Sequence, residues 1–264
     1  MIRVGVLGAA GRMGRTVAAA VAGDPELILV AVVDPAGAGA VVEGVETDAS
    51  LDALTKAEAD VAVDFTHPKA VMENVRWCVA HQVHAVVGTT GITPDDLEEI
   101  RVLTQSGGAN VVVAPNFAIG AVLMMRFAEQ AARYLPAAEI VELHHDGKVD
   151  APSGTAIATA HRIAAARGPD APAAAGGDVA HPGARGAVAP GARGADVEGV
   201  RIHAVRLPGL MAHQEVMLGG PGQILTIRHD STDRASFIPG VLLAVKAVSS
   251  RPGLTVGIEP LLET

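Results

Sequence analysis

Two adjacent histidines and a lysine lie close together in residues 142–156, whose sequence is E-L-H-H-D-G-K-V-D-A-P-S-G-T-A. An imidazole titrates near neutral pH, so His144 or His145 can give a proton to a substrate. Lys148 carries a positive charge, and the S-G-T run at 153–155 is typical of the start of a helix, where free N–H groups bind anions. The stretch predicts a site that protonates a substrate while it holds carboxylates.

Plainer roles remain open for the same residues. A lone histidine is most often a hydrogen-bonded structural residue, and Lys148 can be a solvated loop lysine. Neighbouring residues of a strand point to opposite faces, so His144 and His145 are poorly placed to bind one metal ion together. No set of cysteines or regularly spaced histidines completes a zinc site, and we expect no metal.

A glycine-rich loop, G-A-A-G-R-M-G at 8–14, follows the first apolar run and opens a helix. Glycines there let the backbone turn sharply and approach a pyrophosphate at the helix N-terminus. The spacing is G-x-x-G-x-x-G instead of the commoner G-x-G-x-x-G, so it needs support. Asp34 gives it, because an acid about 20 residues after the last glycine can bind a ribose hydroxyl. A tight turn without a ligand is the alternative. The residues predicted to bind the dinucleotide are Gly8, Ala9, Ala10, Gly11, Arg12, Met13 and Asp34.

Arg12 and Asp34 point to different cofactors. The Arg12 guanidinium could bind the 2′-phosphate of NADPH, or it is simply a solvated residue of the first helical turn. Asp34 would repel that phosphate and favour the free diol of NADH. We therefore expect NADH, with NADPH tolerated.

Two further loops, G-T-T-G at 88–91 and A-P-N-F at 114–117, follow the fourth and fifth apolar runs. They lie at the edge where open α/β sheets bind ligands. Each taken alone could be an ordinary turn, but together they predict contacts to the nicotinamide. Phe65 and Phe117 end strands at the same edge and could flank the ring, although Phe65 could equally be a core residue. The residues predicted to bind the cofactor here are Gly88, Thr89, Thr90, Ala114, Pro115, Asn116 and Phe117.

The first half of the chain alternates apolar runs with helical segments. The runs at 4–7, 27–33, 61–65, 83–87 and 111–114 are continuously apolar, which is typical of parallel strands covered on both faces. A capping Thr93, then Pro94 and two acids predict a helix start. This half is predicted to be a Rossmann-type, doubly wound α/β unit.

The second half has strands that lie too close together for further βαβ units. We expect a helix at 118–134 and strands at 139–145, 200–207, 214–218 and 223–229, which suggest an open mixed sheet in an α+β domain. A last helix is expected from about Ser231 to Ser250. Residues 164–196 are rich in Ala, Gly and Pro and are expected to be mostly a mobile loop.

Composition narrows the class of protein. Hydrophobic residues make up 49% of the 264, so a large core can form. A net charge of −9 argues against a general nucleic-acid binder, and no apolar stretch is long enough to span a bilayer. The single cysteine, Cys78, suits a reducing compartment. Met1 runs directly into an apolar strand without a charged leader, so we expect a cytoplasmic protein.

These motifs together resemble the 4-hydroxy-tetrahydrodipicolinate reductase (dihydrodipicolinate reductase) family along nearly the whole chain. The family motif E-x-H-H-x-x-K-x-D-x-P-S-G-T-A matches 142–156 and is highly specific. The glycine loop, D-F-T at 64–66, V-G-T-T-G at 87–91 and A-P-N-F at 114–117 also match. The runs P-G-A-R-G at 190–194 and H-Q-E-V at 213–216 resemble the actinobacterial branch.

The resemblance implies roles for the residues of the long motif. His144 would donate the proton and Lys148 would be the second donor, while His145, Gly154 and Thr155 would bind the substrate carboxylates. The reaction would be the NAD(P)H-dependent reduction of (2S,4S)-4-hydroxy-2,3,4,5-tetrahydrodipicolinate to tetrahydrodipicolinate, with loss of water, in lysine and diaminopimelate biosynthesis. The binding partner would be this small dicarboxylate, and neither nucleic acid nor a membrane would be bound. The protein would be a homotetramer assembled through the sheets of the substrate domain.

The resemblance also implies two domains, a discontinuous dinucleotide-binding domain at 1–118 and 235–264 and a substrate-binding and oligomerisation domain at 119–234. One departure is Asp146-Gly147, where relatives often carry a basic or bulky residue; an acid there could weaken dianion binding. An alternative is thus a chain that binds cofactor and reduces nothing. A semialdehyde dehydrogenase is a rival that needs a reactive thiolate, and a redox-sensing module would need a DNA-binding element.

Overall fold

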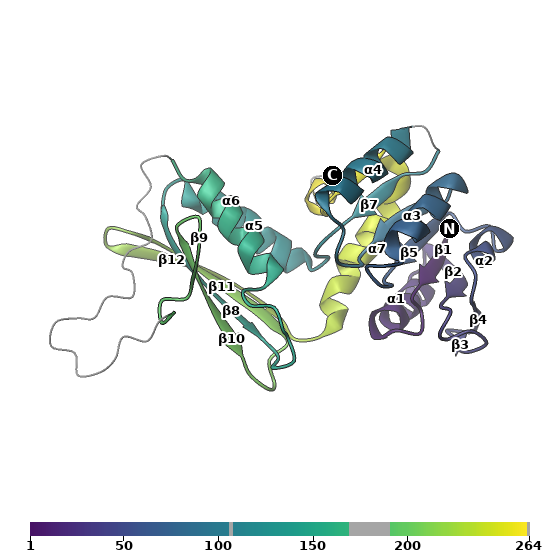
Figure 1. Ribbon diagram of the computed structural model, residues 1–264, viewed down its shortest axis with the longest axis horizontal. Helices are drawn as coiled ribbons and strands as arrows, with labels where there is room; N and C mark the ends of the chain where they lie inside the picture. Colours follow the sequence, from purple (N-terminus) through teal and green to yellow (C-terminus); the bar gives the residue numbers. More distant parts are fainter. Residues whose placement is uncertain (106–107, 169–190, 263–264) are drawn as a thin grey trace. The chain divides into compact units, whose positions relative to one another are not determined.

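The computed structural model describes residues 1–105, 108–168 and 191–262. The chain divides into two compact units, the first made of Met1–Ile119 and Arg234–Thr264 and the second of Gly120–Asp233. The boundaries expected from the sequence each lie one residue from these. The first unit is therefore discontinuous, and the C-terminal segment, yellow in Figure 1, belongs to it.

The first unit contains an eight-stranded sheet with the order β13-β7-β6-β5-β1-β2-β4-β3. Its neighbouring strands are parallel except for the antiparallel pair β3–β4. The central β5 is buried at every position, as a strand covered on both faces must be. The expected doubly wound sheet is confirmed. Its strands are β1 (Ile2–Leu7), β2 (Leu27–Val33), β3 (Val41–Val42), β4 (Val45–Asp48), β5 (Val61–Asp64), β6 (His84–Val87), β7 (Val111–Val113) and β13 (Leu254–Val256).

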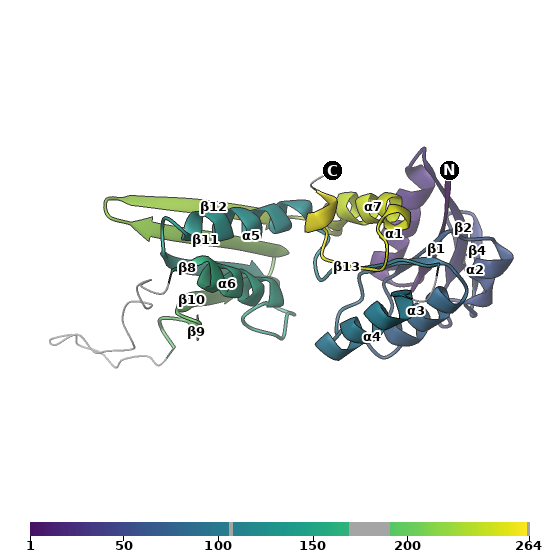
Figure 2. The ribbon, with the colours of Figure 1, turned by 90° about the horizontal axis from the view of Figure 1, so that it is seen from above.

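Helices cover both faces of this sheet (Figure 2). On one face lie α1 (Arg12–Gly23) and α7 (Ile238–Ala247), and on the other α2 (Asp52–Lys56), α3 (Val71–Ala80) and α4 (Pro94–Gln105). Short 3₁₀ turns at Arg234–Phe237 (η1), Val248–Ser250 (η2) and Glu259–Leu261 (η3) flank α7 and close the chain. The start of α4 is the predicted one: the Thr93 hydroxyl accepts the Asp96 N–H at 3.2 Å, and the Asp96 carboxylate accepts the Thr93 N–H at 2.8 Å.

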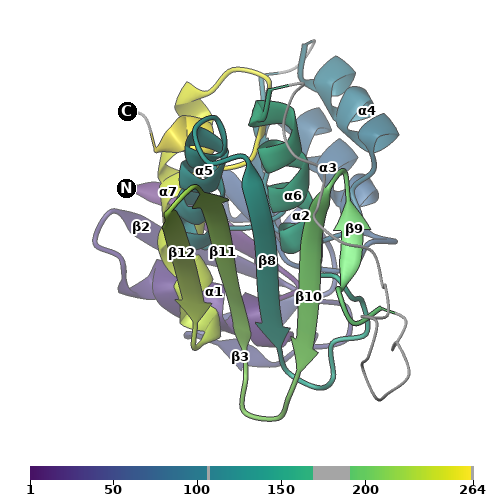
Figure 3. The ribbon, with the colours of Figure 1, turned by 90° about the vertical axis from the view of Figure 1, so that its left-hand side faces the viewer.

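The second unit is a five-stranded mixed sheet with two helices on one face (Figure 3). The strand order is β12-β11-β8-β10-β9, and β8 pairs with β10 in parallel and with β11 antiparallel. Alternate residues of β8 and β11 are buried toward the helices, which leaves the other face of the sheet open. The elements are α5 (Ile119–Ala132), β8 (Ala137–His144), α6 (Gly154–Ala166), β9 (Ala195–Val197), β10 (Val200–Arg206), β11 (Ala212–Gly220) and β12 (Gln223–Ser231).

The shortest elements were not expected from the sequence, and several boundaries differ. The last helix, expected from about Ser231 to Ser250, is α7 (Ile238–Ala247) between the 3₁₀ turns η1 and η2. Strands β3, β4, β9 and β13 and helix α2 were not expected, because they have two to five residues and too little pattern to detect. The segment expected to be mostly a mobile loop, 164–196, begins as the last turn of α6 and ends inside β9; residues 169–190 lie outside the described ranges. Within the described residues, no helix combines the length and the apolarity that crossing a bilayer requires.

Candidate functional site

The glycine loop occupies the turn between β1 and α1. Gly8 has φ +75°, and a Cβ built on it would lie 2.5 Å from the Phe65 carbonyl oxygen. A Cβ on Gly14 would lie 2.1 Å from the Gly8 carbonyl oxygen, so the helix packs directly on the loop. Gly11 is the N-cap of α1 and offers no side chain to satisfy the first N–H groups. These are the features of a backbone cradle for a phosphate.

Asp34 lies immediately after β2 and braces the loop. Its carboxylate accepts N–H groups from Ala10 and Ala36, both at 3.0 Å. A cavity of about 530 Å³ opens beside it. Gly8, Gly11, Asp34, Phe65 and Thr66 are among the residues that line the cavity. The structure thus brings the predicted acid and glycines to one cavity of the first unit, while Arg12 is exposed on the first turn of α1.

The loops after β6 and β7 meet at a second cavity of about 280 Å³. Its lining includes residues from both loops together with Met13 and Phe65. Phe117 is 2% exposed, and its ring lies tilted against Phe65 with centroids 6.0 Å apart. The predicted residues at this cavity are Met13, Gly88, Thr90, Ala114, Pro115, Asn116 and Phe117.

Asp64, at the end of β5, ties the β5 and β6 loops together. Its carboxylate accepts the Thr89 hydroxyl at 2.6 Å, the Thr66 hydroxyl at 2.7 Å and the Asn74 amide at 2.8 Å. Thr89 is 8% exposed, and its hydroxyl is bound inside the protein. The sequence indicated D-F-T only as a matching motif; this bracing role came from the structure.

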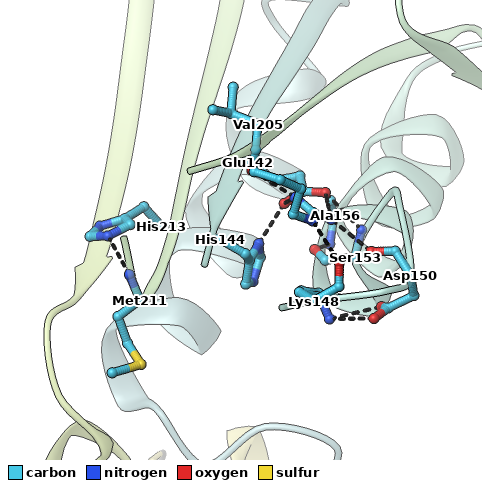
Figure 4. Close-up of polar contacts among 10 residues, drawn as sticks. Glu142, His144, Lys148, Asp150, Ser153, Ala156, Val205, Met211 and His213 are labelled. Atoms are coloured by element: carbon cyan, nitrogen blue, oxygen red, sulfur yellow. Dashed lines mark hydrogen bonds and ion pairs between the residues drawn. The ribbon is translucent and has the colours of Figure 1, made fainter. Parts of the chain in front are cut away.

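His144 is the last residue of β8 and bonds to a buried carboxylate. Its Nδ1 lies 2.5 Å from Oε2 of Glu142, two residues earlier on the same face of the strand (Figure 4). Glu142 is 0% exposed and the His144 side chain 15%. The contact makes Nδ1 the N–H donor and leaves Nε2 as the nitrogen that can exchange a proton with a ligand.

Arg206, the last residue of β10, completes the cluster. It lies opposite His144 in the parallel register and binds both Glu142 oxygens, with each N–O distance 2.8 Å. It also donates to the backbone oxygens of Lys148 at 3.3 Å and Asp150 at 2.6 Å. One guanidinium thus fixes the buried acid and the loop that carries Lys148.

The charges of this cluster oppose one another. Burial acts to raise the pKa of Glu142, but the hydrogen bonds from Arg206 and His144 outweigh it and hold that pKa below its usual range. Burial lowers the pKa of His144; Glu142 opposes this, while the charges of Lys148 and Arg206 add to the lowering. Glu142 is therefore an anion, and His144 is easily deprotonated without a ligand.

Lys148 lies near His144 with its ammonium on Asp150. Both Nζ–O distances are 2.8 Å, and this bond from Lys148 lowers the pKa of Asp150 (Figure 4). The Lys148 side chain is 22% exposed and that of Asp150 61%. A carboxylate of a ligand that binds Lys148 would therefore replace the solvent-exposed Asp150.

The start of α6 is the predicted one. Ser153 is the N-cap, and its hydroxyl accepts the Ala156 N–H at 3.2 Å. The Ser153 N–H itself is bound by Glu142 at 3.1 Å. Gly154 and Thr155 open the helix, and a Cβ on Gly154 would meet nothing within 4 Å. His145 is exposed beyond the strand end, and its backbone oxygen accepts the Lys148 N–H at 3.1 Å.

Two residues of the cluster were not singled out from the sequence. Glu142 was quoted within the motif without a role, although its position two before His144 was a usable signal of a shared strand face. Arg206 carried no signal, because its partner Glu142 is 64 positions away. Among the described residues, no group of three or more acidic, histidine or cysteine side chains is arranged to hold a metal ion.

The family models for dihydrodipicolinate reductase match both parts of the chain, the N-terminal model over residues 2–117 and the C-terminal model over 120–262. The chain belongs to the dihydrodipicolinate reductase family. It is 51% identical to the 4-hydroxy-tetrahydrodipicolinate reductase of Mycolicibacterium vanbaalenii and 52% identical to that of Nocardia farcinica, in each case over 99% of both chains.

A solved dihydrodipicolinate reductase has the same fold as this family member. The dipicolinate-bound enzyme from Paenisporosarcina sp. TG-14 superimposes with a TM-score of 0.83 at 41% identity, over 98% of this chain and 99% of that one. An amine dehydrogenase from Mycobacterium smegmatis, 16% identical with a TM-score of 0.65, shares the fold alone. As expected from the sequence, the reductase family and an oxidoreductase activity are confirmed.

The rival semialdehyde dehydrogenase chemistry has no nucleophile in this family member. Cys78 lies in α3 and is 1% exposed, and burial raises the pKa of its thiol to about 12. A thiol that stays protonated inside the core cannot attack an aldehyde.

Proposed function

We propose that this protein reduces (2S,4S)-4-hydroxy-2,3,4,5-tetrahydrodipicolinate to tetrahydrodipicolinate with NADH or NADPH, a step of lysine and diaminopimelate biosynthesis. In the balanced reaction a hydride and a proton are added, and one water leaves. The observation that carries the proposal is the half-buried His144, bonded to a buried carboxylate, beside Lys148 and the N-terminus of α6. The names of the relatives support the same reaction.

The substrate site is assigned to the second unit. His144 donates the proton from Nε2, because Glu142 occupies Nδ1. Lys148 binds a substrate carboxylate and acts as a second donor, and the N–H groups of Gly154 and Thr155 bind a carboxylate at the start of α6. His145 is exposed and takes a carboxylate at the edge of the site. A relative solved with dipicolinate, an aromatic dicarboxylate, supports this class of ligand.

The cofactor site is assigned to the first unit. The cradle fits a dinucleotide, because Gly8 and Gly14 pack directly against backbone and put no side chain between the loop and a phosphate. The pyrophosphate would lie on the loop at 8–14, the ribose diol at Asp34 and the nicotinamide between the loops 88–90 and 114–117. When bound, the reduced nicotinamide supplies the hydride. Asp34 favours NADH, with Arg12 available to a 2′-phosphate.

We further propose a cytoplasmic homotetramer that binds no nucleic acid and no membrane. The single cysteine, which is buried, supports a cytoplasmic location. The net charge of −9 argues against nucleic-acid binding. Partly exposed apolar side chains such as Val205, on the open face of the second sheet, support assembly through that face.

A coupled assay tests the proposed reaction. The condensation product of aspartate semialdehyde and pyruvate is supplied, and oxidation of NADH and NADPH is followed separately. We expect turnover with both cofactors, a preference for NADH, and a loss of that preference in Asp34→Ala. No oxidation of either cofactor, with cofactor binding intact by fluorescence, would refute the proposal and support the cofactor-binding alternative.

A further inference from the structure

Each carboxylate oxygen of Glu142 has two hydrogen-bond partners. Oε1 accepts an N–H of Arg206 at 2.8 Å and the Ser153 N–H at 3.1 Å, and Oε2 accepts the other Arg206 N–H at 2.8 Å and bonds His144 Nδ1 at 2.5 Å. The side chain is 0% exposed. A carboxylate without access to water that binds four donors joins three separate elements, β8, β10 and the start of α6.

We propose that Glu142 is a positioning residue that sets the proton donor and the carboxylate receptor of the site together, and that Arg206 holds Glu142 in that place. One oxygen orients the His144 ring and the other anchors the first residue before α6. The imidazole and the start of α6 are then held at a fixed separation, because both bond to the same carboxylate. The inference rests on the proposed function, in which His144 protonates the substrate.

The tautomer of His144 follows from this contact. A carboxylate at Nδ1 holds the proton there in the neutral ring, so Nε2 carries the lone pair and takes up the proton to be transferred. Within the described residues, Nε2 makes no hydrogen bond. Without Glu142 the ring would be free to turn and to exchange tautomers, and fewer molecules would present Nε2 correctly.

Three charged groups face the His144 ring: Glu142 on its own strand, Arg206 on the neighbouring β10 and Lys148 on the following loop. The two cations and burial all favour the neutral imidazole, and Glu142 alone favours the imidazolium. Removing Glu142 therefore lowers the fraction of protonated donor at any working pH.

Arg206 has a second effect through the backbone. Its bonds to the Lys148 and Asp150 carbonyl oxygens hold the loop that presents the ammonium. A change at Arg206 would thus remove contacts to the Lys148 loop as well as to Glu142, whereas a change at Glu142 removes neither of those two backbone acceptors directly.

The test uses Glu142→Gln in the full chain. The His144 ring is followed by NMR of its ¹⁵N and ¹³Cε1 signals, assigned by their loss in His144→Gln. We expect the wild-type ring to be the Nδ1–H tautomer at high pH, and the variant to show mixed tautomers and a midpoint lower by about one unit. We expect kcat to fall roughly tenfold, with the alkaline limb of kcat/KM moved to lower pH and the Kd for NADH unchanged.

Glu139→Gln is the matched control. Glu139 lies on the opposite face of the same strand and also binds an arginine and a histidine, Arg193 and His203. We expect its loss to leave the His144 signals unchanged. Glu142→Asp serves if the glutamine variant does not fold: it keeps the charge but withdraws the carboxylate by one methylene, and kcat should fall without a matching fall in thermal stability.

The outcomes separate the two proposals. A wild-type protein that does not reduce the substrate refutes the proposed function, while the NMR comparison still tests the anchoring. An active wild type whose His144 tautomer, midpoint and alkaline limb are the same in Glu142→Gln and Glu142→Asp refutes the positioning role alone.

Discussion

Lys148 and His144 present their charges to a ligand in different ways. The Lys148 ammonium is held by a bidentate contact with Asp150, whose side chain is 61% exposed. An exposed ion pair is weak, worth about 0–1 kcal/mol, so a dianionic substrate can replace it at small cost. His144, in contrast, is bound to a carboxylate that no ligand can reach. The two residues thus differ in whether a ligand can displace their partners.

Lys148→Ala tests the ammonium. We expect kcat/KM for the dicarboxylate to fall about 100-fold, because a charge-assisted contact of roughly 1.5–3 kcal/mol is lost in binding and in the transition state. Cofactor affinity, measured by fluorescence titration, should change little. Lys56→Ala, at the exposed end of α2, is the control and should keep normal kinetics. Normal kcat/KM in Lys148→Ala would remove Lys148 from the site.

The pH dependence follows from His144. A general acid must be protonated, so kcat/KM should fall as pH rises through the pKa of His144 in the free enzyme. Burial lowers that pKa, so the fall should be centred below 6.5, the ordinary value for histidine. A pH profile of kcat/KM measures it, and the limb should vanish in His144→Gln. A midpoint well above 6.5 would contradict the assignment of this limb to His144.

At the scale of single elements, β1 and α1 show how a close approach dictates residue type. Gly14 lies in the first turn of α1, where a Cβ would be 2.1 Å from the Gly8 carbonyl oxygen. The backbone of the loop cannot retreat, because the Gly8 N–H bonds the Val33 carbonyl at 2.8 Å. Glycine is therefore a steric requirement there, against its poor helix propensity of about 1 kcal/mol.

A pair of glycine substitutions in α1 separates contact from propensity. Gly14→Ala should lower the melting temperature and weaken NADH binding at least tenfold, since the helix must move off the loop. Gly23→Ala, in the last turn of the same helix and with open space around it, should leave binding unchanged and raise stability by up to about 1 kcal/mol. Equal effects of the two changes would show that the loop does not need the close approach.

At the scale of the whole molecule, the two sheets differ in how they are covered. The first has helices on both faces, whereas the second has α5 and α6 on one face only (Figures 2 and 3). The open face of the second sheet carries Val141, Leu143 and Val205 among charged side chains such as Glu139 and Arg228. A face of this kind is suited to a further copy of the chain.

Assembly is tested at the centre of that face. Val141→Lys places a charge on the middle strand β8, and we expect the mass measured by light scattering to fall from four chains to fewer. Val102→Lys, 57% exposed on α4, is the control and should leave the mass unchanged. A single-chain mass for the unaltered protein would refute the proposed tetramer.

The fold was largely predictable because its strongest signals are local. Continuous apolar runs predict buried parallel strands, and the T-P-D-D and S-G-T runs predict the starts of α4 and α6, since a cap involves residues two or three apart. Strands β3 and β13 have two and three residues at the ends of a sheet, and their pairing depends on partners distant in the chain.

For the site, the amino-acid sequence alone determined which chemical groups are available: two imidazoles, an ammonium, a helix N-terminus and a glycine loop before an acid. Strand alternation also places Glu142 and His144 on one face. Only the tertiary structure decided that Arg206 binds Glu142 and that Asp64 joins the loops after β5 and β6. The reason is that parallel pairing of β8 with β10 puts Arg206 opposite His144 and so within reach of Glu142, 64 positions away, and no local pattern encodes that pairing.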